Sequence, residues 1–138
     1  MIDAVQRVRS YMSTSPWTIS PELSVVDAAA RMSEHKIRHL PVLDDGTLVG
    51  LVTERDIALV DALSERQRHR IPIHQVMRSS TYVCHPDQPL RDVVKVMVER
   101  KLGSVICVEA GKVVGVFTTI DAMRRLIELC QLVELMAP

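Results

Sequence analysis

The chain has 138 residues, of which 47% are hydrophobic and only 3% aromatic, and its 17 basic residues balance 17 acidic ones. This length fits one ordinary domain or two small halves that share a core. The zero net charge argues against long-range attraction to nucleic acid or to an anionic membrane as the main activity. The first residues lack the apolar stretch of a signal peptide, and no segment approaches the ~20 apolar residues of a membrane span.

The cysteines and histidines give no sign of a metal or catalytic centre. Cys84, Cys107 and Cys130 are odd in number and show no CxxC spacing, which favours reduced thiols packed as small apolar side chains in a cytoplasmic protein. The pair His85 and Cys84 is the nearest approach to a set of metal ligands. No nucleophile elbow is present, so the sequence predicts no metal site and no enzyme.

An internal repeat organises the chain. Shifted by 65 positions, residues 12–59 align without a gap on 77–124, with twelve identical positions. Two copies without a third argue against a solenoid, which needs at least three repeats. We therefore expect two similar units related by a pseudo-two-fold axis. The first covers residues 1–63 with a short lead-in, the second covers 72–138 with an extended C-terminal helix, and a solvated linker over 64–71 joins them.

The first repeat predicts four elements in chain order: a strand at 17–19, a helix over 24–35, a hairpin over 39–52 and a helix over 53–63. Apolar residues recur at helical spacing in the first helix. Asp45-Gly46 supplies the turn of the hairpin, because these residues tolerate positive φ.

The second repeat predicts the same series: a strand at 82–85, a helix over 90–100, a hairpin over 105–117 and a helix from Thr118 to Met136. The apolar positions of this last helix are wider than one core-facing stripe requires. A partner subunit that covers the extra face would explain them. The alternative is a helix wedged between the two halves of its own chain.

Two segments, GLVTERD at 50–56 and GVFTTID at 115–121, share Gly, Thr and Asp at the same spacing. Thr-x-x-Asp at a helix start is a variant of the capping box, and the glycine could simply allow close strand packing. A ligand site is the alternative. Helix N-termini hold phosphates, and a carboxylate one turn in can accept both hydroxyls of a ribose.

Residues 8–57 and 73–122, taken as an ordered set that occurs twice, resemble tandem cystathionine-β-synthase (CBS) domains, the pair called a Bateman module. The resemblance implies an α+β fold of two β-α-β-β-α repeats packed through their sheets. It also implies binding of AMP, ADP, ATP or S-adenosylmethionine in clefts between the repeats.

By position, the resemblance implies ligand contacts at the first strands, before the second strands and at the starts of the last helices. The residues are Thr18, Ile19, Arg38, His39, Thr53, Arg55, Asp56, Val83, Cys84, Gly103, Ser104, Thr118, Thr119 and Asp121. The Thr-x-x-Asp residues would hold ribose, and the first-strand residues would lie along adenine.

The two copies differ in charge at these positions. Arg38, His39 and Arg55 of the first copy could balance a phosphate chain, whereas the second copy has Gly103 and Ile120 at two of the matching positions. We therefore expect unequal affinities at the two sites.

Taken together, these features predict a stand-alone regulatory sensor that forms a homodimer through its repeat helices, including the C-terminal helix. It would act on an unknown partner protein in trans. The alternative is an assembly module without a ligand, in which both Thr-x-x-Asp segments serve only as helix caps.

Overall fold

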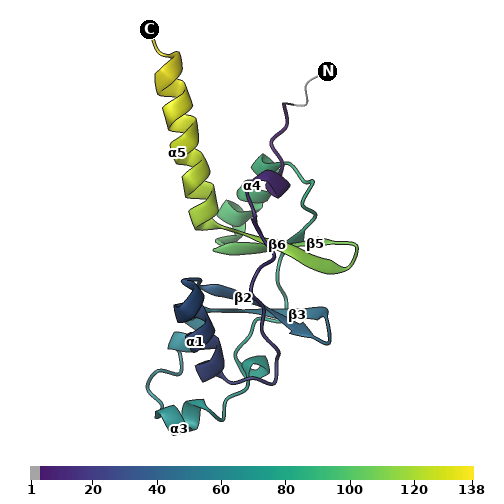
Figure 1. Ribbon diagram of the computed structural model, residues 1–138, viewed down its shortest axis with the longest axis vertical. Helices are drawn as coiled ribbons and strands as arrows, with labels where there is room; N and C mark the ends of the chain where they lie inside the picture. Colours follow the sequence, from purple (N-terminus) through teal and green to yellow (C-terminus); the bar gives the residue numbers. More distant parts are fainter. Residues whose placement is uncertain (1–3) are drawn as a thin grey trace. The chain divides into compact units, whose positions relative to one another are not determined.

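The computed structural model describes residues 4–138, which divide into two compact units (Figure 1). The first-repeat unit is Pro16–Thr81, and the second-repeat unit joins the described residues up to Ser15 to Tyr82–Pro138. The lead-in of the first repeat, up to Ser15, therefore packs with the second repeat, and the lead-in of the second repeat, 72–81, packs with the first. This grouping differs from the boundaries drawn on the sequence. Residues 1–3 of the expected first repeat lie outside the described residues.

The second-repeat unit contains a four-stranded sheet in the order β1-β6-β5-β4. Its strands are β1 (Ser13–Thr14), β4 (Val83–Cys84), β5 (Ser104–Glu109) and β6 (Lys112–Thr118). Strand β4 runs parallel to β5, and the other pairs are antiparallel. Its helices are the 3-10 turn η1 (Val8–Ser10), α4 (Leu90–Arg100) and α5 (Thr119–Met136).

The first-repeat unit repeats this plan with shorter pairings at its edges. Its elements are α1 (Val25–His35), β2 (His39–Asp44), β3 (Thr47–Thr53), α2 (Glu54–Ala58), α3 (Glu65–Arg68) and the 3-10 turn η2 (Ile73–Gln75). Strands β2 and β3 form an antiparallel hairpin. Single bridges from Ile19 to Val42 and from Arg78 to Leu51 stand where β4 and β1 stand in the second-repeat unit. The predicted duplicated α+β plan is confirmed.

Both hairpins turn as the sequence predicts. Asp45 and Gly46 have φ of 48° and 83°, and Ala110 and Gly111 have φ of 51° and 76°. Two successive residues with positive φ are typical of the type I′ turn, whose twist matches that of the flanking strands. The turn residues thus fix the register that brings β3 and β6 to the starts of α2 and α5.

Each unit has its own aliphatic core, and the two cores use matching helix positions. The buried residues of α1 are Val25, Ala28 and Met32, and those of α4 are Leu90, Val93 and Met97. Their spacing of three and four residues is the core-facing stripe of an α-helix.

Gly50 and Gly115 allow a lead-in to approach closely. A Cβ built on Gly50 would lie 2.7 Å from Met77 Sδ and 2.8 Å from the carbonyl oxygen of Arg78. A Cβ on Gly115 would lie 2.5 Å from Met12 Sδ and 3.0 Å from the carbonyl oxygen of Ser13. Real Cβ atoms do not tolerate such distances, so both glycines serve strand packing, one of the two roles considered above.

Two segments differ from their sequence expectations. The helix predicted to reach residue 63 ends at Ala58, and the chain continues in tight turns, with hydrogen bonds from Val60 N–H to the Ile57 carbonyl and from Leu63 N–H to the Val60 carbonyl. The expected linker contains α3, whose Ser64 and Gln67 form a capping box, although none of its residues is buried. The Ser-x-x-Gln pattern is typical of a helix start and could have predicted α3.

Within residues 4–138, no helix combines the length and the apolar character needed to cross a membrane.

Candidate functional site

The first capping box, Thr53 with Asp56, closes the N-terminus of α2. Asp56 Oδ2 accepts from Thr53 N–H and from the Thr53 hydroxyl, both at 2.9 Å, and Thr53 Oγ1 accepts from Asp56 N–H at 3.2 Å. The second capping box, Thr118 with Asp121, has the same bonds at 2.9, 3.1 and 3.2 Å. The capping role predicted for both segments is confirmed.

Capping leaves one carboxylate oxygen of each aspartate for other partners. Oδ2 already accepts two hydrogen bonds, which fills its two lone pairs. Asp56 Oδ1 lies 3.4 Å from Arg78 Nε, and Asp121 Oδ1 lies 3.9 Å from Arg124 Nη1, beyond hydrogen-bond distance. Each Oδ1 is therefore a rigidly held acceptor, and that of Asp121 is the less engaged of the two.

Matching backbone hydrogen bonds bring the residues before the second strands to these helix starts. Glu54 N–H donates to the Arg38 carbonyl at 2.9 Å, and Thr119 N–H donates to the Gly103 carbonyl at 3.0 Å. Arg38, Thr53 and Asp56 thus lie together in the first-repeat unit. Gly103, Ser104, Thr118 and Asp121 lie together in the second-repeat unit.

First-strand residues alternate between surface and core. Ile19 and Cys84 are 2% and 3% exposed, and their side chains belong to the hydrophobic cores. Val83 is 44% exposed, and Thr18 is half-buried. The Thr18 carbonyl accepts from Arg31 Nη1 at 2.5 Å. Within the predicted pairs Thr18–Ile19 and Val83–Cys84, only the outward residues, Thr18 and Val83, have side chains that a ligand can contact.

Charged side chains collect around the first capping box. Arg38 and Arg55 are exposed, and Arg38 Nε lies 3.6 Å from a Glu54 carboxylate oxygen. His39 Nδ1 is buried and has no hydrogen-bond partner among residues 4–138. Burial, and then the nearby Arg38 charge, lower the pKa of His39. His39 is therefore a neutral residue beside the cationic ones.

Two residues near the predicted site escaped the sequence interpretation. Arg78 forms an ion pair with Asp56, and Arg31 donates a hydrogen bond to the Thr18 carbonyl. The first comes from the lead-in of the other repeat, which pairs with β3 across Gly50. The repeat alignment could have indicated Arg31, because a charged residue stands there in the first copy where the second copy has the apolar Val96.

A surface hollow of about 530 Å³ lies in the first-repeat unit, between α1 and the start of α2. Its lining includes Lys36, Arg38, Glu54 and Asp61 but neither Thr53 nor Asp56. The hollow therefore shares only its edge with the residues around the first capping box.

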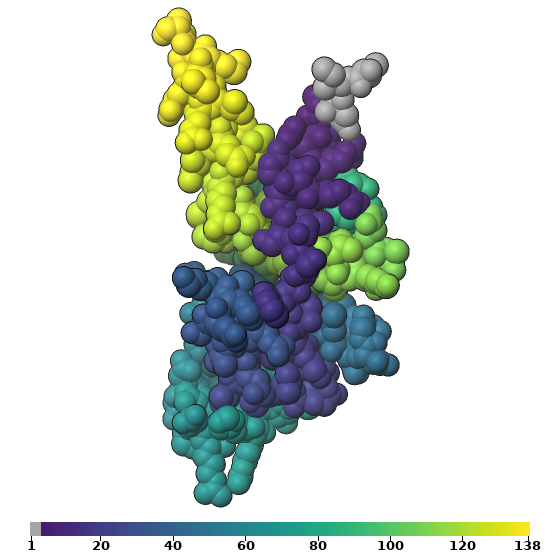
Figure 2. All heavy atoms as spheres, viewed as in Figure 1, coloured from purple at the N-terminus to yellow at the C-terminus, as the bar shows by residue number. Residues whose placement is uncertain are grey.

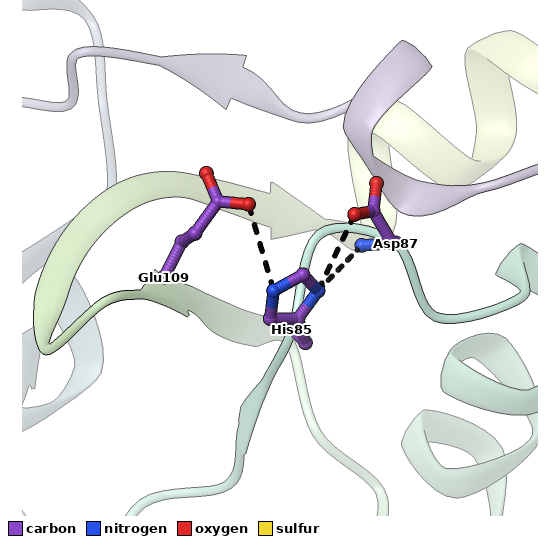
Figure 3. A group of neighbouring side chains, drawn as sticks. All are labelled: His85, Asp87 and Glu109. Carbon is purple, nitrogen blue, oxygen red and sulfur yellow. Dashed lines mark hydrogen bonds and ion pairs between the residues drawn. The ribbon is translucent and has the colours of Figure 1, made fainter.

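A separate cluster in the second-repeat unit brings His85, Asp87 and Glu109 together (Figure 3). Their candidate ligand atoms all lie within 4.8 Å of one another. The guanidinium of Arg9 holds both carboxylates, with 2.9 Å from Nε to Asp87 Oδ1 and 2.5 Å from Nη2 to Glu109 Oε2. His85 Nδ1 accepts from Asp87 N–H at 3.1 Å. These contacts fasten the lead-in to the sheet.

We expect the Arg9 cluster to make stability depend on pH. Hydrogen bonds from Arg9 lower the pKa of Asp87 and of Glu109 below their ordinary values of 3.8 and 4.5. A carboxyl whose pKa is lower when folded adds stability above its unfolded pKa, and this is lost as pH falls through the folded value. Arg9→Met should therefore lower the melting temperature at pH 7 by a modest amount, because the groups are exposed. The deficit should shrink as pH falls from 7 to about 3, and should vanish only below the lowered pKa values of the two carboxyls.

Thermal unfolding of the wild-type and Arg9→Met proteins across this pH range checks the expectation. Arg91→Met is the matched control, since Arg91 is exposed and lies 3.8 Å from Asp92. An Arg9→Met deficit as large at about pH 3 as at pH 7 would contradict the ionic role of the cluster.

Comparisons with known proteins agree with this duplicated architecture. Residues 8–63 and 73–128 each match the CBS domain family. The CBS domain-containing protein YhcV of Bacillus subtilis is 29% identical over 109 residues, which cover 79% of this chain and 77% of YhcV. L-aspartate semialdehyde sulfurtransferase of Methanocaldococcus jannaschii is 31% identical over 126 residues, and this chain spans only 24% of that protein.

Solved structures show the same fold. The CBS domain pair of protein MJ0100, in complex with 5′-methylthioadenosine and S-adenosyl-L-methionine, has a TM-score of 0.79 at 30% identity, covering 88% of this chain and 96% of that one. CBSX2 in complex with AMP has a TM-score of 0.77 at 27% identity, covering 89% and 97%. AcuB of Vibrio cholerae has a TM-score of 0.83 at 27% identity, covering 97% and 99%. With two family matches that together span most of its length, this chain belongs to the CBS domain family.

Proposed function

We propose that this chain is a regulatory module that binds an adenosine-containing ligand at residues around its two capping boxes. The observation that supports the proposal is the Oδ1 of each capping aspartate, held in place by the bonds to Oδ2: Asp56 Oδ1 has only a long contact of 3.4 Å with Arg78 Nε, and Asp121 Oδ1 lies 3.9 Å from Arg124 Nη1. A carboxylate oxygen fixed in this way can accept a ribose hydroxyl without losing side-chain freedom on binding. The complexes of MJ0100 and CBSX2 with adenosine compounds support this ligand class.

The two capping boxes offer different surroundings to such a ligand. Around the first, Arg38, Arg55 and Arg78 supply positive charge that suits phosphate. Around the second, Thr119 and Ile120 replace charged residues, and Asp121 Oδ1 lies beyond hydrogen-bond distance of Arg124. We infer that the second box favours an uncharged or singly charged adenosine compound and that the first favours a phosphorylated one.

A panel of ligands tests the proposal by thermal unfolding. AMP, ADP, ATP, S-adenosylmethionine and 5′-methylthioadenosine are added separately at millimolar concentration. A ligand at a hundredfold over its dissociation constant adds about 2.7 kcal/mol to the free energy of unfolding. For a domain of this size we therefore expect a rise of roughly 5–15 °C with at least one compound. No rise with any of them would remove the ligand-binding proposal.

We also propose that two copies associate through α5. None of its residues is buried, and its exposed apolar residues are Ile120, Met123, Leu126, Ile127, Leu129, Leu132, Val133, Leu135 and Met136. Figure 2 shows the C-terminal half of α5 standing clear of the rest of its own unit. At its base, Arg125 packs over the Tyr11 ring at 4.8 Å. A continuous apolar surface of this kind marks an association site.

Two variants test the dimer, each of which adds one negative charge to a different face of α5. Leu129→Glu puts a carboxylate on the apolar surface, and Gln131→Glu, two residues away, puts it on the polar stripe. Burying an unpaired charge in an interface costs several kcal/mol, so Leu129→Glu should shift the molar mass in solution to that of one chain. Gln131→Glu should leave it at that of two chains. A single-chain mass for the unaltered protein would contradict the dimer.

We further propose that the module regulates a separate partner protein in trans. The exposed surface of α5 also supports the second candidate, an assembly module without a ligand. Only the ligand panel separates the two, because both candidates use the dimer.

A further inference from the structure

The second-repeat unit holds two thiols side by side in its core. Cys84 in β4 and Cys107 in β5 are register partners on neighbouring parallel strands. Their Sγ atoms lie 3.6 Å apart, and the side chains are 3% and 0% exposed. The third cysteine, Cys130, is exposed on α5.

The backbone already holds this pair close to the geometry of a disulfide. Neighbouring strands lie about 4.8 Å apart, which falls inside the Cα separation of roughly 4.4–6.8 Å that disulfides span. Both side chains point to the same face of the sheet, because directly paired residues do so. A bond would need the sulfur atoms to approach from 3.6 Å to about 2.0 Å, a side-chain rotation rather than a rearrangement of strands.

The surroundings give the two thiols different roles. A hydrogen bond from the Cys107 thiol stabilises the Cys84 thiolate and lowers the pKa of Cys84. The same bond, together with burial, raises the pKa of Cys107. Cys84 also lies on β4, the two-residue strand at the edge of the sheet, whereas Cys107 lies on the inner strand β5. Since the thiolate is the nucleophile, Cys84 is the thiol that attacks first and Cys107 the one that resolves.

We propose that Cys84 and Cys107 form a redox modification site, a reversible intramolecular disulfide made by a hydroperoxide. The Cys84 thiolate attacks the terminal peroxide oxygen, so that an S–O bond forms, the O–O bond breaks and the alcohol, or water from hydrogen peroxide, leaves with a proton. The Cys107 sulfur then attacks the Cys84 sulfenic acid. An S–S bond forms, the S–O bond breaks, and hydroxide leaves with the Cys107 proton as water. Two thiols lose two electrons, and the peroxide gains them.

Access to the thiols comes through the short strand β4. It contributes only Val83 and Cys84 to the sheet, and its neighbours Val83 and His85 are exposed. Elements with few ladder bonds and exposed flanks open locally at low cost, which admits a molecule as small as hydrogen peroxide. The site does not depend on adenosine binding, so its test stands apart from that of the proposed function.

Peptide mapping tests the site on the whole protein, because trypsin separates the three cysteines. Cleavage places Cys84 in 79–91, Cys107 in 102–112 and Cys130 in 126–138. After treatment with hydrogen peroxide and alkylation of the remaining thiols, we expect 79–91 linked to 102–112. The free alkylated forms of both peptides should fall together, and dithiothreitol should restore both. Cys130→Ser is the control and should give the same linked peptide.

A second variant tests the order of attack. Cys107→Ser leaves Cys84 without its resolving partner but keeps a hydroxyl beside it that can donate a hydrogen bond, so a sulfenic acid on 79–91 should become trappable by dimedone. Two results would overturn the site. One is consumption of Cys130 while Cys84 and Cys107 stay alkylatable in the folded unaltered protein. The other is a linked peptide that forms only in urea concentrations that unfold the chain.

Discussion

Asp121→Ala is expected to remove about half or more of the ligand-induced rise in melting temperature while lowering the stability of the free protein only slightly. Without ligand, the change removes the carboxylate half of the second capping box, which costs about 1 kcal/mol, or roughly 2–5 °C. With ligand, it removes an acceptor for ribose hydroxyls. A hydrogen bond to a charged group contributes about 1.5–3 kcal/mol, so affinity should fall by roughly tenfold to more than a hundredfold.

The chain offers a matched control for this variant. Ser24 and Asp27 form a capping box at α1 with bonds of 2.9, 3.1 and 3.2 Å, nearly the same as those of Thr118 and Asp121. Asp27 is not among the predicted ligand residues. Asp27→Ala should therefore match Asp121→Ala in the free protein and keep the full ligand shift. If both variants keep the shift, the second capping box serves only the helix.

Asp56→Ala should cost more stability than Asp121→Ala. Asp56 is 5% exposed, and its loss also leaves Arg78 without its carboxylate partner. The remaining ligand-induced shift in melting temperature is compared between the two variants for each compound. The difference measures how unequal the ligand affinities of the two capping boxes are.

Gly50→Ala is expected to destabilise the chain by about 2–3 kcal/mol, because the added methyl group meets a backbone atom that has little room to move. The clash is with the carbonyl oxygen of Arg78 at 2.8 Å, in addition to Met77 Sδ at 2.7 Å. Gly115→Ala should cost only about 1 kcal/mol. Its closest contact is Met12 Sδ at 2.5 Å, the end of a flexible side chain, and the Ser13 carbonyl oxygen lies at 3.0 Å.

Shortening the methionines separates the two clashes. In a Met12→Ala background, Gly115→Ala should cost almost nothing further, since the added methyl group fills the space that the thioether leaves. In a Met77→Ala background, Gly50→Ala should keep most of its cost. Denaturant unfolding of the four variants and their two backgrounds measures these differences. Equal costs at the two glycines would show that the lead-ins do not approach as described.

Local chemistry made most of the fold predictable. Asp45-Gly46 and Ala110-Gly111 fixed both hairpin turns, and the stripes through Met32 and Met97 predicted the core faces of α1 and α4. The pairing of each lead-in with the other repeat was not predictable in this way. It depends on contacts between residues such as Ser13 and Val116, which are far apart in the sequence and carry no local signal.

The candidate site was predictable where its geometry is local. Thr53 with Asp56 and Thr118 with Asp121 lie one helical turn apart, so their spacing determines their contact. The ion pair between Arg78 and Asp56 was missed because Arg78 belongs to the lead-in of the second repeat, which packs with the first repeat. The packed thiol of Cys84 was predicted, but a two-residue strand is too short for alternation to show which of Val83 and Cys84 faces outward, so both were given as ligand residues.

Isothermal titration of the purified protein with the five adenosine compounds tests the central claim most directly. The proposal predicts saturable binding of at least one compound, and weakening of that binding in Asp56→Ala or Asp121→Ala but not in Asp27→Ala. The absence of saturable binding by all five at millimolar concentration, with the protein folded, would contradict it.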